Sequence, residues 1–313
     1  MTRETLEGIA AWLSSNTDTL GFLAYWAVLA LFAGLEAFIP AFQQPPQREK
    51  RWATNLGLGI VNMLLAPLAP VSAVWGAQWA EQQGFGLLNV MGGPFWVAVI
   101  ATFAIRDFAG YLFHVLMHNV VLFWRMHRVH HFDTHLDAST SLRSHPVEFG
   151  ALLVTMVPLA IALGLDPWAL AAYEIVLTFV NVYTHVNLRL PKRLDRALRW
   201  LLVTPNMHCL HHSSFQPETD SNYGQVFSLW DRLFGTYSAA PKAGYDAMQI
   251  GLAEIRDGRT SDLWWQIKSP ALAIKRVSAN AATPADTCVQ SSRLPREKEA
   301  ARRSTSPVRR SKR

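Results

Sequence analysis

Long apolar stretches alternate with short polar segments from the N-terminal region to about residue 188. Several of these stretches exceed the roughly 18 apolar residues expected of a membrane-spanning helix. The pattern therefore predicts an all-α integral membrane protein, a helical bundle of about four to five spans. We expect the spans at about Thr19–Pro40, Leu56–Trp79, Pro94–Phe113, Phe149–Leu165 and Trp168–Leu188.

The fourth and fifth predicted spans are separated by only a few residues. The connection, Gly164-Leu165-Asp166-Pro167, combines a helix-ending glycine with an Asp-Pro pair that favours a new helix start. The two segments either cross the membrane twice or form a hairpin that does not cross fully, and the sequence is compatible with both. In the second span Pro67 and Pro70 predict a kink, because proline lacks the amide hydrogen that a helix needs.

Lys and Arg indicate the orientation of these spans, because cytoplasmic loops carry an excess of both residues. Neither residue occurs in 55–105 or in 149–188, so the loop at 80–93 and the turn at Asp166 are expected outside. Arg51 and Arg128 mark internal loops. This pattern places the N-terminus outside, and the histidine repeats and the C-terminal tail on the cytoplasmic side.

Charge is concentrated at one end of the chain. The whole chain has a net charge of +6, and residues 293–313 alone contribute +7. The rest of the chain therefore has a net charge of −1, which gives no support for a nucleic-acid partner. Four regions are expected: an N-terminal segment (1–18), a membrane domain (19–261), an interfacial segment with Trp264, Trp265 and Lys268 (262–276), and a basic disordered tail (277–313).

The candidate chemistry lies in the histidines. All eleven fall between His114 and His212, and eight of them form three repeats: His114-x3-His118, His127-x2-His130-His131 and His208-x2-His211-His212. Residues three or four apart share one face of a helix, and neutral imidazole suits iron, zinc and copper. Eight histidines exceed the coordination capacity of one ion, so the repeats predict a site for two metals.

Two polar stripes at helical spacing run along otherwise apolar predicted spans. One comprises Asp107, Tyr111, His114 and His118, and the other Glu174, Thr178, Asn181 and His185. Both are expected to face the bundle interior, because unpaired polar groups facing lipid are costly. Asp107, Glu148 and Glu174 are interpreted as acceptors for the outer ring N–H of ligand histidines. The alternative is hydrogen bonding between helices that only fixes their packing.

Several classes of metal protein do not fit the repeats. No repeat has the Glu of the H-E-x-x-H zinc proteases, and none has the Glu-x-x-His pairs of soluble di-iron bundles. Cys209 lies off the face that the third repeat shares, so it is expected to pack rather than to bind metal. A membrane metal transporter or metal-storage protein remains an alternative use of the same histidines.

In order and spacing, the three repeats resemble those of the fatty acid hydroxylase / sterol desaturase superfamily. Further segments similar to the family are Arg143-x-His145-Pro146-x-Glu148, Asn181-x3-His185, Asp220-Ser-Asn222-Tyr223-Gly224 and Trp230–Tyr237. The resemblance implies the metal ligands His114, His118, His127, His130, His131, His185, His208, His211 and His212. Tyr111, His145 and Asn181 are then expected to support these ligands without binding metal directly.

The resemblance also implies a function: a di-iron centre that activates O2 and hydroxylates or desaturates a membrane lipid, such as a sterol, a fatty acyl chain or an ether lipid. The two electrons would come from a separate ferredoxin, cytochrome b5 or pterin-like donor. The chain has neither a G-x-G-x-x-G nucleotide motif nor a C-x-x-C-H haem motif.

Overall fold

The computed structural model describes residues 17–43, 47–66, 72–188, 190–245 and 247–275. Pro67, Pro70 and the predicted basic tail lie outside these residues, as does most of the predicted N-terminal segment. Within the described ranges the chain is helical, and no strand longer than an isolated bridge occurs. The predicted all-α class is therefore confirmed.

The longer helices form the body of the protein. They are α2 (Thr17–Phe38), α3 (Arg48–Leu65), α4 (Ala73–Gln82), α6 (Phe95–Asn119), α7 (Val121–His131), α8 (Pro146–Leu163) and α9 (Pro167–His185). Shorter helices are α5 (Leu87–Met91), α10 (Lys192–Leu198), α11 (Pro205–His211), α12 (Gln216–Thr219), α13 (Leu229–Leu233) and α14 (Leu263–Lys268). Single 3-10 turns occupy Ala138–Leu142, Gly258–Ser261 and Ser269–Ala271.

Within the described ranges, three helices are long and apolar enough to cross a membrane, namely α2, α6 and α8. They correspond to the first, third and fourth predicted spans. The fifth predicted span forms α9, which does not meet the same criterion. Glu174 and Asn181 lower the hydropathy of this helix.

The second predicted span is wrong as a single helix. The structure divides Leu56–Trp79 between α3, which ends at Leu65, and α4, which begins at Ala73. The side chain of Ser72 accepts a hydrogen bond from the amide of Trp75 at 3.1 Å and thereby caps the start of α4. Neither helix is among those suited to cross a membrane.

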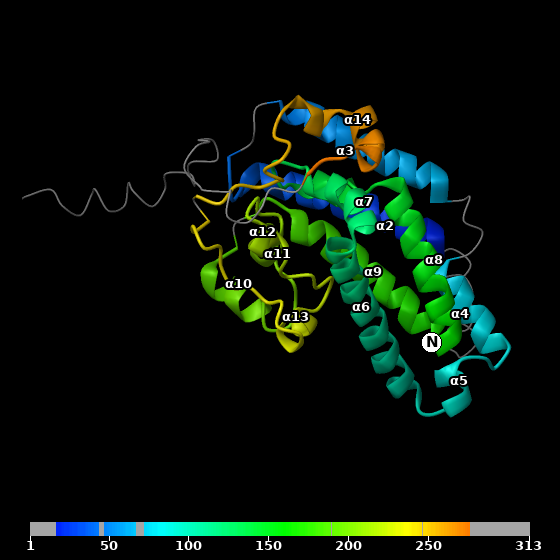
Figure 1. Cartoon of the computed structure of the whole chain (residues 1–313). Coiled ribbons are helices and arrows are strands. Elements are labelled where there is room, and N and C mark those ends of the chain that lie inside the picture. Colours follow the sequence, from blue (N-terminus) through cyan, green and yellow to red (C-terminus); the bar gives the residue numbers. More distant parts are fainter. Residues whose placement is uncertain (1–16, 44–46, 67–71, 189, 246, 276–313) are drawn as a thin grey trace, which may run out of the picture.

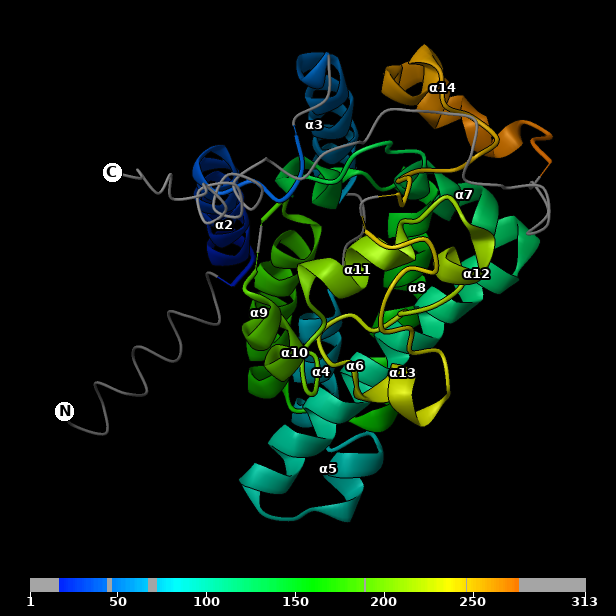
Figure 2. The same cartoon turned by 90° about the vertical axis from the view of Figure 1, so that its left-hand side faces the viewer.

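Helix α9 lies at the centre of the bundle. It packs against α2, α4, α6 and α11, while α4 also packs against α8. In both views α5 lies at one end of the bundle and α3 and α14 at the other, with α7 and α11 between them (Figures 1 and 2). The C-terminal end of α6 leads directly into α7, which carries the second histidine repeat.

The predicted connection between α8 and α9 is confirmed. Gly164 ends α8 with a φ of 60°, a left-handed conformation that glycine adopts without a steric penalty. Asp166 then caps α9 by accepting a hydrogen bond from the amide of Ala169 at 2.8 Å. Pro167 occupies the first turn of α9, where its missing amide hydrogen costs nothing.

A buried network of charges fixes the loop that follows α7. Arg51 of α3 bonds both Asp133 and Asp137 in this loop. Arg143, which is fully buried, donates to the side chain of Asn55 at 2.8 Å and to the carbonyl of Val129 at 2.8 Å. Buried charges persist when they are paired in this way, and the network holds the loop after α7 against α3.

The segment 258–274 packs over α7. Arg128 of α7 donates to the carbonyl of Leu272 at 2.9 Å and also to that of Ser269. The ring of Trp265 contacts that of Phe132, whereas Trp264 is exposed. Of the two tryptophans predicted to lie at the membrane interface, only Trp264 is therefore free to do so.

Candidate metal centre

The nine predicted ligand histidines come together from four helices. Helix α6 supplies His114 and His118 near its C-terminal end, and His185 is the last residue of α9. The remaining six lie on α7 and α11 or at the end of α11: His127, His130, His131, His208, His211 and the C-cap residue His212. All nine side chains are buried.

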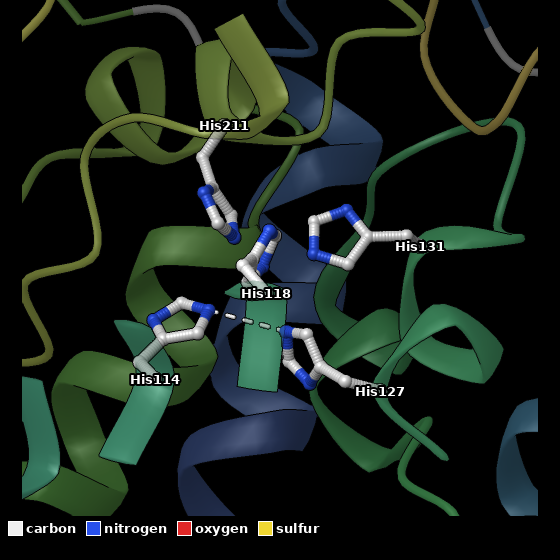
Figure 3. A group of neighbouring side chains, drawn as sticks. All are labelled: His114, His118, His127, His131 and His211. Atoms are coloured by element: carbon white, nitrogen blue, oxygen red, sulfur yellow. Dashed lines mark hydrogen bonds between the residues drawn. The ribbon is translucent and has the colours of Figure 1, made fainter. Parts of the chain in front are cut away.

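The histidines form two groups. Group 1 comprises His114, His118, His127, His131 and His211, and group 2 comprises His130, His185, His208 and His212. Within each group the candidate ring nitrogens all lie within 4.8 Å of one another. In Figure 3 the five rings of group 1 point toward a common centre.

The two groups are adjacent and their ring nitrogens converge. In group 1, Nε2 of His114 lies 3.2 Å from Nε2 of His127. In group 2, Nε2 of His185 lies 3.1 Å from that of His130 and 3.0 Å from that of His208. The ring centroids of His131 in group 1 and His212 in group 2 are 4.5 Å apart. This spacing allows two ions to lie side by side.

The H-x2-H-H spacing explains how one repeat serves both groups. At about 100° per residue, positions i and i+4 are about 40° apart on a helix, whereas i+3 and i+4 are about 100° apart. His127 and His131 accordingly belong to group 1, and His130 to group 2. In the third repeat His208 and His212 belong to group 2, and His211 to group 1.

Backbone carbonyls hold the outer nitrogen of several rings. In four rings Nδ1 donates to a backbone carbonyl. The pairs are His114 to Tyr223 (2.9 Å), His130 to Arg143 (3.0 Å), His185 to Asn181 (2.6 Å) and His211 to Ser221 (2.7 Å). A carbonyl only accepts, so each of these rings carries its proton on Nδ1. The lone pair of Nε2 is left free to bind a metal.

Unpaired ring nitrogens test whether the site fits a metal. Nε2 of His131 and Nε2 of His211 are buried and have no hydrogen-bond partner in the described part of the chain. Burying a polar atom without a partner is costly, and a metal ion would remove this cost at both atoms. The two groups therefore fit transition-metal ions that prefer nitrogen ligands.

Burial keeps these imidazoles neutral. It lowers the pKa of His211 to about 3, and it lowers the pKa values of His131, His208 and His212 well below their ordinary value. Desolvation is the largest cause, and the neighbouring histidines add to it where they oppose a second positive charge. Neutral imidazole is the form that binds metal.

Among the three predicted acidic contacts, only Glu148 reaches a histidine of the two groups. Its Oε1 accepts from Nδ1 of His127 at 2.7 Å. The prediction for Asp107 and Glu174 is wrong. Asp107 accepts from the Tyr173 hydroxyl at 2.6 Å and from Nε1 of Trp230 at 2.7 Å, and Glu174 pairs with Arg106.

Distance along the helix explains this difference. Asp107 precedes His114 by seven residues of α6, which at 1.5 Å per residue is about 10 Å. It anchors the loop before α13 instead, because it also accepts from the amides of Val226 and Phe227.

The three other supporting residues have different positions. The hydroxyl of Tyr111 contacts that of Thr236 at 3.0 Å. His145 caps α8, since its Nδ1 accepts from the amide of Val147, and its Nε2 donates to the carbonyl of Ile267 at 3.1 Å. Asn181 supports His185 through its backbone carbonyl rather than through its side chain.

Sequence reasoning did not identify all the contacts of the histidines. Asp220 lies 3.2 Å from Nδ1 of His118, a contact that its place in the Asp220–Gly224 segment does not indicate. The carbonyls of Arg143, Ser221 and Tyr223 leave no side-chain signal in the sequence. Cys209 is buried and belongs to neither group, as the helical spacing indicated.

A cavity of about 290 Å³ opens next to both groups. His114 and His127 of group 1 line it, as do His130, His185 and His208 of group 2. Its other walls come mainly from α6, α8 and α9. A volume near 300 Å³ is at the lower end for ligand pockets, so only part of a long molecule would fit in it.

Comparison with known proteins identifies relatives of this arrangement. Residues 99–236 match the family model described as fatty acid hydroxylase. The chain is 27% identical over 203 residues to human alkylglycerol monooxygenase, covering 63% of this chain and 42% of the relative. It is 25% identical over 190 residues to the ornithine lipid hydroxylase OlsE of Rhizobium tropici, covering 60% and 52%.

A plant protein is also similar. The very-long-chain aldehyde decarbonylase GL1-6 of Oryza sativa subsp. indica is 28% identical over 218 residues, which cover 66% of this chain and 32% of the relative. The chain thus matches about half or less of the length of these three relatives. No solved structure matches it. The family match contains all nine histidines of both groups, and the predicted resemblance to this superfamily is confirmed.

Proposed function

We propose that the protein is an O2-dependent di-iron oxidoreductase that hydroxylates or desaturates a membrane lipid. The observation that carries this proposal is the pair of buried all-histidine groups beside one cavity. Nitrogen-rich sites suit iron, and the cavity brings a substrate next to both groups. The names of two relatives, a monooxygenase and a lipid hydroxylase, favour hydroxylation over desaturation.

The nine histidines of the two groups would hold the ions, and bound iron would supply O2 activation and the oxidising power to cleave an unactivated C–H bond. The chain itself provides rigid positions for its imidazoles. The carbonyls of Tyr223 and Ser221 fix the rings of His114 and His211, so the ligand atoms need little rearrangement. The buried surroundings exclude water from the place of reaction.

Further aspects of the proposal concern partners and location. A lipid reaches the cavity from the bilayer that α2, α6 and α8 are suited to cross. The site and the C-terminal tail lie on the cytoplasmic side, where a separate ferredoxin, cytochrome b5 or pterin-like protein supplies electrons. The membrane domain extends over about 19–261, beyond the matched family region.

Metal analysis of detergent-purified protein tests the proposal. We expect about two irons per chain, and their loss in His211→Ala, because this residue supplies an unpaired buried Nε2 to group 1. His135→Ala is the matched control, since His135 belongs to neither group. Protein in liposomes with a chemical reductant should then convert added lipid to an oxygenated or desaturated product.

Two results would contradict the proposal. One is a single zinc that survives His211→Ala. The other is iron that is retained without any lipid product while cells expressing the chain accumulate metal. The second result would support metal transport or storage, although the described histidines of both groups form one cluster rather than a path across a membrane.

A further inference from the structure

Large apolar side chains are exposed on two short helices that carry none of the histidines, α10 and α13. The set includes residues that adjoin the two helices and comprises Leu194, Trp200, Leu201, Leu229, Leu233 and Phe234. We call it the α10–α13 surface. Neither helix is among those suited to cross a membrane. Exposed apolar side chains gathered in this way, with charged residues beside them, are typical of a surface that contacts a protein or a membrane.

Hydrogen bonds hold the two parts of this surface together. The amide of Ser228 donates to the carbonyl of Leu201 at 3.0 Å, and its hydroxyl donates to the carbonyl of Arg199 at 2.6 Å. Arg232 of α13 donates to the same carbonyl of Arg199 at 2.8 Å, and its guanidinium lies 4.8 Å from the centre of the Trp200 ring. The exposed side chains of α10 and α13 therefore belong to one fixed unit.

Contacts with α6 place α13 at the level of the middle of that helix. Asp107, midway along α6, accepts a hydrogen bond from Nε1 of Trp230 at 2.7 Å. The ring of Phe108 lies 4.9 Å from that of Trp230 and 5.6 Å from that of Phe234. In both views α13 lies beside α6 and nearer to α5 than α11 does (Figures 1 and 2). If α6 crosses a membrane, the exposed side of α13 therefore lies at the depth of the bilayer.

The exposed charges of α10 are all positive. Lys192, Arg193 and Arg196 are exposed, whereas Asp195 is buried and pairs with Arg199 at 2.9 Å. In both views α10 lies nearer than α13 to the end of the bundle that α3 and α14 form (Figures 1 and 2). Cations on one side of an apolar surface match a bilayer, in which anionic headgroups lie outside the acyl chains. Long Lys and Arg side chains can reach such headgroups from the level of the chains.

We propose that the α10–α13 surface inserts into the leaflet nearer the histidine groups, with its apolar side chains among the acyl chains and Lys192, Arg193 and Arg196 at anionic phospholipid headgroups. Its contact with α6 and the positive charge of α10 favour phospholipid over a water-soluble protein, which would have to enter the bilayer to reach this level. The inference goes beyond the proposed function, because it assigns a membrane contact to helices too short to cross and depends on neither iron nor the reaction.

Fluorescence quenching in lipid nanodiscs that hold one iron-loaded chain each tests the insertion. A fluorophore is attached to Leu233→Cys in a background without Cys209 and Cys288, and is quenched either by acrylamide in the water or by bromine on the lipid acyl chains. We expect strong quenching by the brominated lipid and loss of quenching by acrylamide, as for Ile100→Cys on the exposed side of α6. Asp257→Cys is the aqueous control and should show the reverse, because Asp257 is exposed outside this surface. With one chain in each disc, a second copy cannot cover the label.

A second label tests the headgroup contact. Leu201→Cys is labelled in discs of equal phosphatidylcholine and phosphatidylglycerol, with bromine on one lipid or on the other. We expect phosphatidylglycerol to be enriched roughly fivefold at this label, the effect of about one cation near an anionic surface. Lys192→Gln, Arg193→Gln and Arg196→Gln together should abolish the enrichment.

The matched control removes three exposed cations at the end of the bundle that α3 and α14 form. Lys50→Gln, Arg256→Gln and Lys268→Gln together should leave the enrichment at Leu201→Cys unchanged. Iron content shows whether each variant retains its fold.

Two results would overturn the inference. Acrylamide that quenches the label at Leu233→Cys as strongly as that at Asp257→Cys would show that water covers this surface in single chains, which leaves it to a soluble partner or a second copy. Equal quenching by the two brominated lipids at Leu201→Cys would show that the cations of α10 do not recruit anionic headgroups. Neither measurement detects lipid oxidation, so both results are independent of the proposed function.

Discussion

At the scale of single residues, the atoms that orient the histidines matter as much as the histidines themselves. Four outer ring nitrogens donate to backbone carbonyls, which substitution of side chains does not remove. Glu148 on His127 and Asp220 on His118 are the side-chain partners. Both partners can be removed by mutation, and Asp220 lies outside the cavity residues.

Asp220→Ala is therefore expected to weaken metal binding without removing a ligand. Loss of the contact with His118 frees the ring to rotate, and such losses typically lower metal affinity about 10- to 100-fold. Competition with a chelator of known affinity measures the change. Asp262→Ala, which removes a capping carboxylate at the start of α14, should leave it unaltered. Equal affinities for Asp220→Ala and the unaltered protein would contradict the role of Asp220.

The sequence predicted the histidines better than their neighbours, for a physical reason. Spacing of three and four residues determines which side chains share a helix face, so the repeats alone indicate converging imidazoles. The partners of Asp107 and Glu174 depend on how α6, α9 and the loop before α13 pack, and spacing within one helix does not contain this information. Arg106, the partner of Glu174, was not singled out from the sequence.

At the scale of helices, apolar length predicted α2, α6 and α8 but joined α3 to α4. The length of an apolar stretch reflects how favourably the segment is removed from water. The start of α4 depends instead on a local hydrogen bond to the Ser72 side chain, which a hydropathy pattern does not predict. The charged residues of α3 also have a role that composition did not indicate. Arg51 is buried and pairs with Asp133 and Asp137 rather than facing the solvent.

Contacts between α7 and the segment 258–274 give a prediction at this scale. Arg128→Ala should destabilise the protein by about 2–3 kcal/mol, because it leaves the buried carbonyl of Ser269 and that of Leu272 without a charged donor. Hydrogen exchange should rise in 258–274 before it rises in α6. Arg125→Ala removes a neighbouring charge that makes no such contacts and is the control. Unchanged exchange in 258–274 would show that Arg128 does not hold this segment.

At the scale of the whole molecule, the ends of the bundle allow a test of the orientation predicted from Lys and Arg. The turn after α4 and the turn before α14 lie at opposite ends in both views (Figures 1 and 2). Gln83 and Asp257 are exposed there. If the positive-inside pattern holds, these two positions lie on opposite sides of the membrane.

Labelling with a membrane-impermeant maleimide distinguishes the two sides. In a background without Cys209 and Cys288, we expect Gln83→Cys to react in intact cells. Asp257→Cys should react only after lysis. Reaction of both positions in intact cells, or the reverse order, would contradict the proposed cytoplasmic location of the histidine groups.

The interleaving of the two H-x2-H-H repeats has a consequence for how the protein holds its metals. Both α7 and α11 contribute to group 1 and to group 2, whereas α6 contributes only to group 1 and α9 only to group 2. An ion that binds group 1 therefore also fixes His130, His208 and His212 for group 2. Displacement of α7 or α11 disturbs both groups at once, so a variant in which either helix is displaced is expected to lose both ions together.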